Sequence, residues 1–260
     1  MITTYNRLFR AEWVKLRSLR SSGWTLSTMV VAGIGFSALL CALTASHWSH
    51  VSAANRATWD PTNQSLVGTV FGQLAIGVLG VLAVTSEYTS GTIRSTIAAV
   101  PRRTPVLVAK AVVYGGVALV AGEIISLASF FIGQTLFGSK VPHASFTQPG
   151  VARAVLLAGV YLALVCLLAI AIGAALRHTA GAITAVVAIL LVLPGIVSAI
   201  PGSFAQSVSW YLPPQLAGSS MGAVVPEPGA LGPWAATAVL VGYVAVAMLV
   251  AGRLLVRRDV

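Results

Sequence analysis

Polar side chains inside long apolar stretches are the residues of this sequence best placed to do chemistry. Glu123 lies within one such stretch, and Gln73 lies within another. A charged group inside a bilayer is costly, so an ionisable residue there is by default a candidate for a functional role. Glu123 and Gln73 are therefore candidates for a translocation path. Glu123 could instead carry protons, or could be a protonated residue that packs helices together.

The sequence offers little support for metal, redox or nucleotide chemistry. His47 and His50 lie three residues apart, but no Cys, Asp or Glu nearby completes a metal site, so we expect surface histidines and no metal. Cys41 and Cys166 lie in apolar runs, as buried thiols do. There is no Gly-x-x-x-x-Gly-Lys-Ser/Thr phosphate loop and no Gly-x-Ser-x-Gly elbow. We therefore expect no cofactor, no ATP hydrolysis and no hydrolase activity in this chain.

The elements that position these residues are predicted to be membrane helices. Of the 260 residues, 57% are hydrophobic and 8% are charged, whereas a soluble domain is about 25% charged. A helix needs about 20 apolar residues to cross a bilayer. Runs of that length predict an all-α polytopic membrane protein, a single domain over residues 1–260. Its six spans are expected at about 24–45, 66–85, 106–135, 155–176, 180–200 and 231–255.

The distribution of basic residues predicts how the chain is oriented. The sequence holds 16 Lys and Arg against 6 Asp and Glu. If both termini are cytoplasmic, only Arg56, Lys140 and Arg153 fall outside, in agreement with the positive-inside rule. We therefore expect a multi-pass protein of the plasma membrane with both termini in the cytoplasm. Because orientation and anionic lipid explain the positive charge, we expect no nucleic-acid partner.

Residues 1–22 have the spacing of an amphipathic helix that lies on the membrane surface. Its apolar face carries Tyr5, Leu8, Phe9, Trp13, Leu16 and Leu19, and its basic face carries Arg7, Arg10 and Arg17. Glu12 falls on the apolar side, which predicts a polar contact with another segment or chain. The helix is either a surface anchor that only fixes topology or a specific docking element.

Residues 87–103, between the second and third spans, have the pattern of a short helix. Thr89 or Ser90 can cap its start, and Pro101 ends it. Ile93, Ile97 and Val100 share one face, and the flanking cations are Arg94, Arg102 and Arg103. This pattern favours a docking element for a cytosolic partner. The alternative is a reverse turn that arginines hold at the lipid surface.

Two motifs next to the first two spans carry a family resemblance. Arg10-Ala11-Glu12-Trp13-Val14-Lys15-Leu16-Arg17-Ser18 precedes the first span. Glu87-Tyr88-Thr89-Ser90-Gly91-Thr92-Ile93-Arg94 follows the second span, with Pro101-Arg102-Arg103 and Lys110 further on. In these motifs the chain resembles a permease subunit of the type-2 ATP-binding-cassette (ABC) transporters, particularly the small six-span kind common in actinobacteria.

The resemblance implies roles for three segments. A coupling helix from about Thr89 to Val100 would insert into the ATPase subunit. The ATPase-coupling residues would be Glu87, Gly91, Thr92, Ile93, Arg94, Ile97, Pro101, Arg102 and Arg103. Residues 1–22 would form a connecting helix beside it, with Glu12, Trp13 and Lys15 as its marked residues. Residues 201–230 would form short re-entrant helices on the outer side, or an ordinary outer loop.

The resemblance also implies what the chain works with. We expect a permease subunit that forms the translocation path and is not itself an enzyme. The resemblance implies export as the direction of transport. Its partners would be a cytosolic ATPase subunit, a second permease subunit and membrane lipid. Two alternatives stay open: a proton-coupled secondary transporter that uses Glu123, and a membrane anchor or sensor without transport. Gly68, Gly72, Gly77 and Gly80 permit close helix approach, either between two permeases or within this chain.

Overall fold

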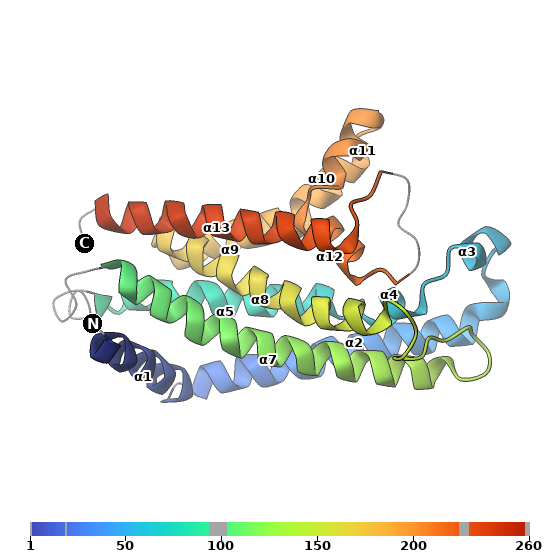
Figure 1. Ribbon diagram of the computed structural model, residues 1–260, viewed down its shortest axis with the longest axis horizontal. Helices are drawn as coiled ribbons and strands as arrows, with labels where there is room; N and C mark the ends of the chain where they lie inside the picture. Colours follow the sequence, from blue (N-terminus) through green and yellow to red (C-terminus); the bar gives the residue numbers. More distant parts are fainter. Residues whose placement is uncertain (1, 19, 94–102, 224–228, 258–260) are drawn as a thin grey trace.

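The structure is a computed structural model that describes residues 2–18, 20–93, 103–223 and 229–257. Within these ranges the secondary structure is helical and contains no strand, so the prediction of an all-α protein is confirmed. Long helices lie side by side along the longest axis of the molecule (Figure 1). Both termini lie at one end of this bundle, which we call the terminal end. The other end is called the opposite end.

In the described part of the chain, six helices are long and apolar enough to cross a membrane, as many as the sequence predicts. The candidate spans are Leu26–His50, Thr69–Thr89, Thr104–Phe137, Val151–Leu176, Thr179–Ala199 and Pro233–Arg257. They belong to the helices α2 (Arg20–His47), α5 (Thr69–Thr89), α7 (Arg103–Phe137), α8 (Val151–Leu176), α9 (Thr179–Val187) with its continuation, and α13 (Pro233–Arg257). The multi-pass membrane class follows from these lengths and compositions.

Helix α8 lies at the centre of the bundle and packs against α5, α7 and α13. It has the highest mean hydropathy of the six candidate spans, 2.9, and the largest buried share, 67%. A helix that is apolar on every side is stable only where other helices or lipid surround it. Its fully buried side chains include Val155, Leu162, Cys166 and Ile170. The helices that carry the polar residues described below are therefore held by a common apolar core.

Glycines of α5 let neighbouring helices of the same chain approach closely. A Cβ atom on Gly80 would lie 2.6 Å from the carbonyl oxygen of Cys166 on α8. A Cβ on Gly77 would lie 2.8 Å from Val186 of α9, and Gly68 packs against the backbone of Gly33 on α2. Small residues permit such contacts between membrane helices. The glycines therefore serve packing within this chain, which was one of the two alternatives left by the sequence.

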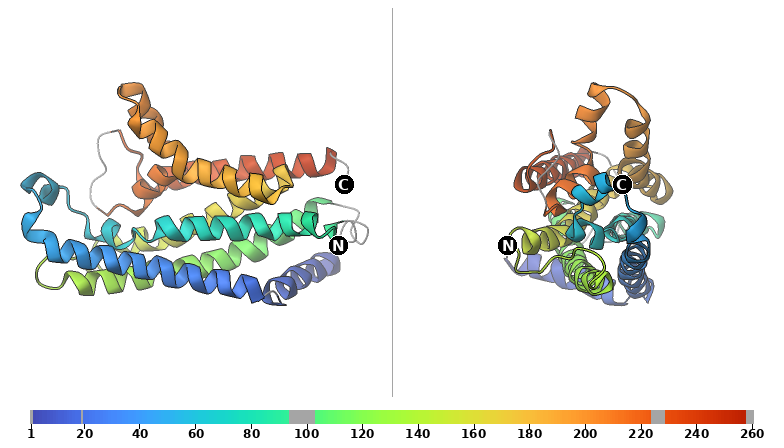
Figure 2. Two further views of the ribbon diagram at one scale, coloured as in Figure 1. Left: turned by 180° about the vertical axis from the view of Figure 1, so that it is seen from behind. Right: turned by 90° about the vertical axis from the view of Figure 1, so that its right-hand side faces the viewer.

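The fifth span is irregular. Helix α9 continues through a π-helical segment, η2 (Ala188–Val192), into α10 (Leu193–Ala199). Pro194 lacks an amide hydrogen, so the regular hydrogen bond to the residue four positions earlier is lost at this point. Helix α10 and the following α11 (Ser203–Ser209) project away from the bundle (Figure 2).

The predicted outer segment 201–230 contains two short helices with different surroundings. Helix α11 is largely exposed, and Phe204 is 81% exposed. Helix α12 (Pro213–Met221) returns to the bundle and packs against α8 and α13, with Leu216 and Met221 buried. Residues 224–228 of this segment lie outside the described residues.

Short helices complete the two ends. At the opposite end are the 3-10 helix η1 (Trp48–His50), α3 (Ala53–Ala57) and α4 (Pro61–Ser65). At the terminal end, α1 (Ile2–Ser18) precedes α2 and packs against α7. The predicted amino-terminal helix of residues 1–22 is thus present as α1 and the first turn of α2. Part of it, residue 19, is outside the described residues.

Candidate functional site

Helix α1 is fixed to the bundle through one face. Leu8, Glu12 and Leu16 are spaced four residues apart, so they lie on one side of the helix, and all three are buried. Leu8 packs against Val106 and Ala109 of α7. Glu12 is only 2% exposed, which confirms that its position on the apolar side reflects a polar contact with another segment. Trp13 lies off this face and is 50% exposed.

The contact of Glu12 is with Lys110, a buried lysine near the start of α7. The Lys110 Nζ lies 2.9 Å from Glu12 Oε2 and 2.7 Å from Glu87 Oε1. It also donates to the carbonyl oxygen of Ala83 at 2.9 Å. An ammonium group has three hydrogens to donate, and here each has an acceptor. Lys110 is 3% exposed, so this lysine of the second motif is buried and does not lie on the surface.

Lys15 binds the same two carboxylates from one turn further along α1. Its Nζ lies 2.8 Å from Glu12 Oε1 and 2.7 Å from Glu87 Oε1. Burial acts to lower the pKa of Lys15, but the hydrogen bonds and negative charges of Glu12 and Glu87 outweigh it, so the pKa is raised above its ordinary value. The side chain is 40% exposed, so Lys15 covers the group on the solvent side.

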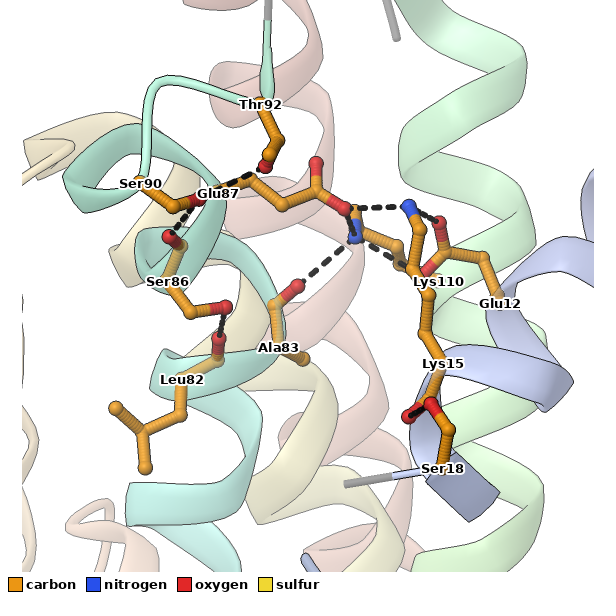
Figure 3. Close-up of polar contacts among 10 residues, drawn as sticks. All are labelled: Glu12, Lys15, Ser18, Leu82, Ala83, Ser86, Glu87, Ser90, Thr92 and Lys110. Atoms are coloured by element: carbon orange, nitrogen blue, oxygen red, sulfur yellow. Dashed lines mark hydrogen bonds and ion pairs between the residues drawn. The ribbon is translucent and has the colours of Figure 1, made fainter. Parts of the chain in front are cut away.

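We call Glu12, Lys15, Glu87 and Lys110 the ion cluster (Figure 3). Its two carboxylates and two ammonium groups have no net charge, and they come from α1, α5 and α7. A buried charge is tolerated when it is paired and hydrogen-bonded, and removing one partner leaves the other uncompensated. The ion cluster therefore fixes these three helices to one another at the point where α5 ends and α7 begins.

The chain between α5 and α7 starts directly at the ion cluster. Gly91 has a φ of +73°, a left-handed conformation that ends helices and that glycine adopts without steric cost. Ser90 Oγ and Thr92 Oγ1 are 2.9 Å apart, and Gly91 and Thr92 are exposed. Ile93 is buried, next to Tyr88 and Lys110 around a cavity of about 20 Å³. Ile93 therefore packs on its own chain.

The remaining predicted residues of segment 87–103 are only partly described. Arg94, Ile97, Pro101 and Arg102 lie outside the described residues. Of the short helix predicted from about Thr89 to Val100, only the part up to Ile93 is described, and there Thr89 is the last residue of α5. Arg103 is the first residue of α7. The structure thus brings together Glu12, Lys15 and Glu87 of the predicted site residues, and adds Lys110.

Gln73 belongs to a different site, close to the opposite end. Its Oε1 accepts a hydrogen bond from the Tyr161 hydroxyl of α8. Both side chains line a cavity of about 300 Å³ that also contains Trp59, Asp60 and Met221. This cavity is bounded by α4, α5, α8 and α12, so it places polar side chains in an otherwise apolar part of the bundle.

Glu123 does not share that cavity. It lies where α7 meets α8, against Gly159, whose missing side chain leaves the space that the carboxyl group occupies. Among the described residues, Glu123 Oε2 is buried and has no hydrogen-bond partner. The polar partner of Gln73 is Tyr161, so the two residues predicted for a translocation path lie at separate places in the bundle.

No group of three or more His, Cys, Asp or Glu residues that could hold a metal ion is found in the described part of the chain. Cys41 and Cys166 are buried free thiols, as their apolar surroundings predicted. His47 Nδ1 contacts the carbonyl oxygen of Leu43 at 3.0 Å. The polar chemistry that the structure does show is ion pairing at the terminal end and hydrogen bonding in the Gln73 cavity.

Sequence reasoning missed Lys110 and Tyr161 as site residues. Lys110 is the charged residue in an otherwise apolar start of α7, and an ionisable group in a membrane helix is itself a signal of function. Tyr161 carries no comparable signal, because a tyrosine within an apolar helix is an ordinary core residue.

A family model described as "ABC-2 family transporter protein" matches residues 8–203, which is more than half of the chain. The match begins within α1 and ends at the start of α11, so it includes all four residues of the ion cluster. No curated protein matches the chain.

Proposed function

Because the chain belongs to the ABC-2 transporter family, whose members are membrane permease subunits of ABC transporters, we propose that it is the permease of an exporter. Segment 87–103 couples it to a separate cytosolic ATPase subunit, and α1 supports that segment from the side. A second permease subunit completes the transporter, as the family resemblance implies. Both termini and segment 87–103 then face the cytoplasm.

The ion cluster is the observation that carries this proposal. Glu87 lies in the last turn of α5, and Lys110 lies about two turns after the start of α7. These helices therefore flank segment 87–103. Glu12 ties α1 to α7 through Lys110, and Lys15 ties α1 to α5 through Glu87. A force on the segment would therefore move α1, the end of α5 and the start of α7 together, because the ion cluster prevents them from bending independently.

Coupling requires that the ATPase subunit interacts differently with two arrangements of the permease. Packed helices change arrangement in discrete steps, because their interfaces do not deform continuously. The Gln73 cavity lies at the other end of α5 from Glu87. Helix α5 thus runs from the proposed coupling site to the proposed translocation path, and it is the element we expect to transmit the change.

Family membership favours this function over the two alternatives. A proton-coupled carrier needs a relay for its proton, yet Glu123 Oε2 has no hydrogen-bond partner among the described residues. A membrane anchor without transport would not need a buried ion cluster next to an exposed loop. Variants of Glu87 and Glu123 distinguish the proposed function from both alternatives, because these two carboxylates lie at different depths of the bundle.

The test is affinity purification of the tagged chain in mild detergent from its native cells. We expect co-purification of a protein whose peptides contain a phosphate loop, together with ATPase activity that vanadate inhibits. Glu87→Ala and Arg94→Ala should each lower the recovery of this ATPase by at least about tenfold, since truncating one partner of a buried charged contact costs about 2 kcal/mol or more. Recovery is measured per amount of folded permease, because Glu87→Ala also removes a partner from the ion cluster.

Glu123→Ala is the matched control, because it removes a carboxylate of the same length outside the ion cluster. We expect normal ATPase recovery and activity for this variant. Normal recovery for Glu87→Ala and Arg94→Ala would contradict the coupling assignment. If Glu123→Ala alone abolished uptake or efflux driven by a pH gradient in vesicles, the proton-coupled alternative would be supported instead.

A further inference from the structure

A large apolar groove lies between α7 and α13 near the terminal end. Its volume is about 640 Å³. The walls are formed by Leu107 and Val108 of α7 and by Met248, Leu249 and Val256 of α13. Leu249 and Val256 are 65% and 61% exposed. We call this the α7–α13 groove.

Two arginines stand at the end of the α7–α13 groove. Arg253 and Arg257 are four residues apart, so they lie on the same side of α13 as Leu249, and both line the groove. Both are exposed, and neither makes an ion pair with another described residue. None of the described residues that line the groove is Asp or Glu. The groove is thus apolar along its length and cationic at the terminal end.

The start of α7 adds to the positive potential at the same place. Thr104 lines the groove and lies in the first turn of α7. The first amide groups of a helix have no partner within the helix, and the helix dipole is positive there. Arg253 and Arg257 are the main positive groups of the groove, and the positive end of the α7 dipole lies near them.

We propose that the α7–α13 groove binds an anionic phospholipid, with an acyl chain along Leu107, Leu249 and Val256 and the phosphate held by Arg253 and Arg257. This site is distinct from the ion cluster and from the Gln73 cavity. Basic pockets between membrane helices are suited to phospholipid head groups. The two arginines favour an anionic phospholipid over an apolar protein segment as the occupant of the groove. An apolar segment would leave both guanidinium groups without a partner, whereas a phosphate pairs with them.

The length of the groove also fits a lipid. Its lining runs from Ala245 to Arg257 on α13. At 1.5 Å per residue this is about 18 Å, which is more than half of the roughly 30 Å hydrocarbon layer of a bilayer. An acyl chain of one leaflet therefore spans the apolar part while its head group reaches the arginines.

The proposal is tested with the full chain purified in detergent, incubated with either phosphatidylglycerol or phosphatidylcholine of identical acyl chains. Native mass spectrometry counts the retained lipid, and the apparent melting temperature measures its stabilising effect. We expect phosphatidylglycerol to be preferred. The double variant Arg253→Gln/Arg257→Gln should lower that preference about tenfold, since each basic residue near an anionic head group contributes on the order of a few-fold in affinity.

Gly252→Leu blocks the groove while leaving both arginines in place. Gly252 lines the groove, and a Cβ at this position would meet no atom within 4 Å, so the substitution fills the space without disturbing the fold. We expect loss of phosphatidylglycerol retention with an unchanged or higher melting temperature in the absence of lipid. Leucine also has a higher helix propensity than glycine.

Arg10→Gln/Arg17→Gln is the matched control, because it removes two exposed arginines of α1 at the same end of the molecule. It should keep the preference for phosphatidylglycerol. An equal loss in this control would show a general surface-charge effect and would overturn the proposal. Unchanged retention of phosphatidylglycerol in Gly252→Leu would also overturn the proposal. If the groove variants changed ATPase recovery or oligomeric state without a change in bound lipid, the occupant would be a protein.

Discussion

Lys110 is the residue on which the ion cluster depends. It contacts Glu12 on α1, Glu87 on α5 and the carbonyl oxygen of Ala83, and it is more deeply buried than Lys15. The two lysines bind the same carboxylates, but water can replace Lys15 and cannot reach the position of Lys110. Their variants should therefore differ strongly in stability.

We expect Lys110→Met to destabilise the protein by about 3–5 kcal/mol, the cost of removing one partner of a buried ion pair. Methionine has a similar length but cannot neutralise Glu12 and Glu87. Lys15→Met should cost about 1 kcal/mol or less, because exposed ion pairs are weak. Thermal unfolding of the purified protein in detergent measures both values.

Lys140→Met is the control for this comparison, since Lys140 is an exposed lysine at the opposite end. It should unfold like the unmodified protein. Equal melting temperatures for Lys110→Met and Lys140→Met would show that the ion cluster does not hold the helices together. A triple change of Glu12→Gln, Glu87→Gln and Lys110→Met should recover part of the loss, because no unpaired buried charge remains.

Sequence could predict one half of the ion cluster. The position of Glu12 on the apolar face follows from helical spacing alone, and a polar contact for it was expected. Its partner could not be identified, because Glu12 and Lys110 are 98 residues apart in the sequence, and Lys15 and Glu87 are 72 residues apart. Such pairing is decided by how α1, α5 and α7 pack, which local patterns do not contain.

At the scale of elements, the contact between α5 and α8 sets how closely the core packs. Gly80 faces the backbone of α8 with no room for a side chain, whereas Gly116 of α7 has no atom within 4 Å of its Cβ position. We expect Gly80→Ala to destabilise the protein by about 1–3 kcal/mol through overpacking. Gly116→Ala should be neutral or more stable by about 1 kcal/mol, because alanine favours the helix.

The two alanine variants are compared by thermal unfolding in the same detergent. Both variants replace a helical glycine with alanine, so a difference between their melting temperatures reflects the space available for a side chain at each position. If both variants unfold at the same temperature, α5 and α8 do not approach as closely as the structure has them. If Gly80→Ala also changes the oligomeric state, the glycine would face a second permease.

The lengths of the elements could be predicted from the thickness of a bilayer, but their irregularities could not. The predicted span 106–135 lies inside α7, which has 35 residues and is about 52 Å long at 1.5 Å per residue. The prolines after residue 190 indicated a break. They did not indicate that α10 and α11 would project from the bundle while α12 returns to it, because that depends on packing against α8 and α13.

At the scale of the whole molecule, the two ends differ in charge. The described basic residues at the terminal end are Arg7, Arg10, Lys15, Arg17, Arg20, Arg103, Lys110, Arg177, Arg253 and Arg257, and those at the opposite end are Arg56, Lys140 and Arg153. The fold class followed from composition and run lengths, since no other architecture satisfies backbone groups in uncharged runs of this length. The orientation in the membrane is a separate prediction.

Cysteine labelling tests the orientation and, with it, every cytosolic contact proposed for this chain. The native Cys41 and Cys166 are fully buried, so they give a low background. Ser18, Ser90 and Lys140 are exposed and accept single cysteine substitutions. In intact cells a membrane-impermeant maleimide should label Lys140→Cys but neither Ser18→Cys nor Ser90→Cys, because short cytoplasmic segments carry the basic excess.

Permeabilised cells provide the internal control, since all three variants should then react. Labelling of Ser90→Cys in intact cells would place the end of α5 outside, where a cytosolic ATPase subunit cannot bind it. Labelling of Ser18→Cys and Ser90→Cys together, without Lys140→Cys, would mean that the whole bundle is inverted. In that case the ion cluster would stabilise an outward-facing end, and the positive charge of the terminal end would need a cause other than the positive-inside rule.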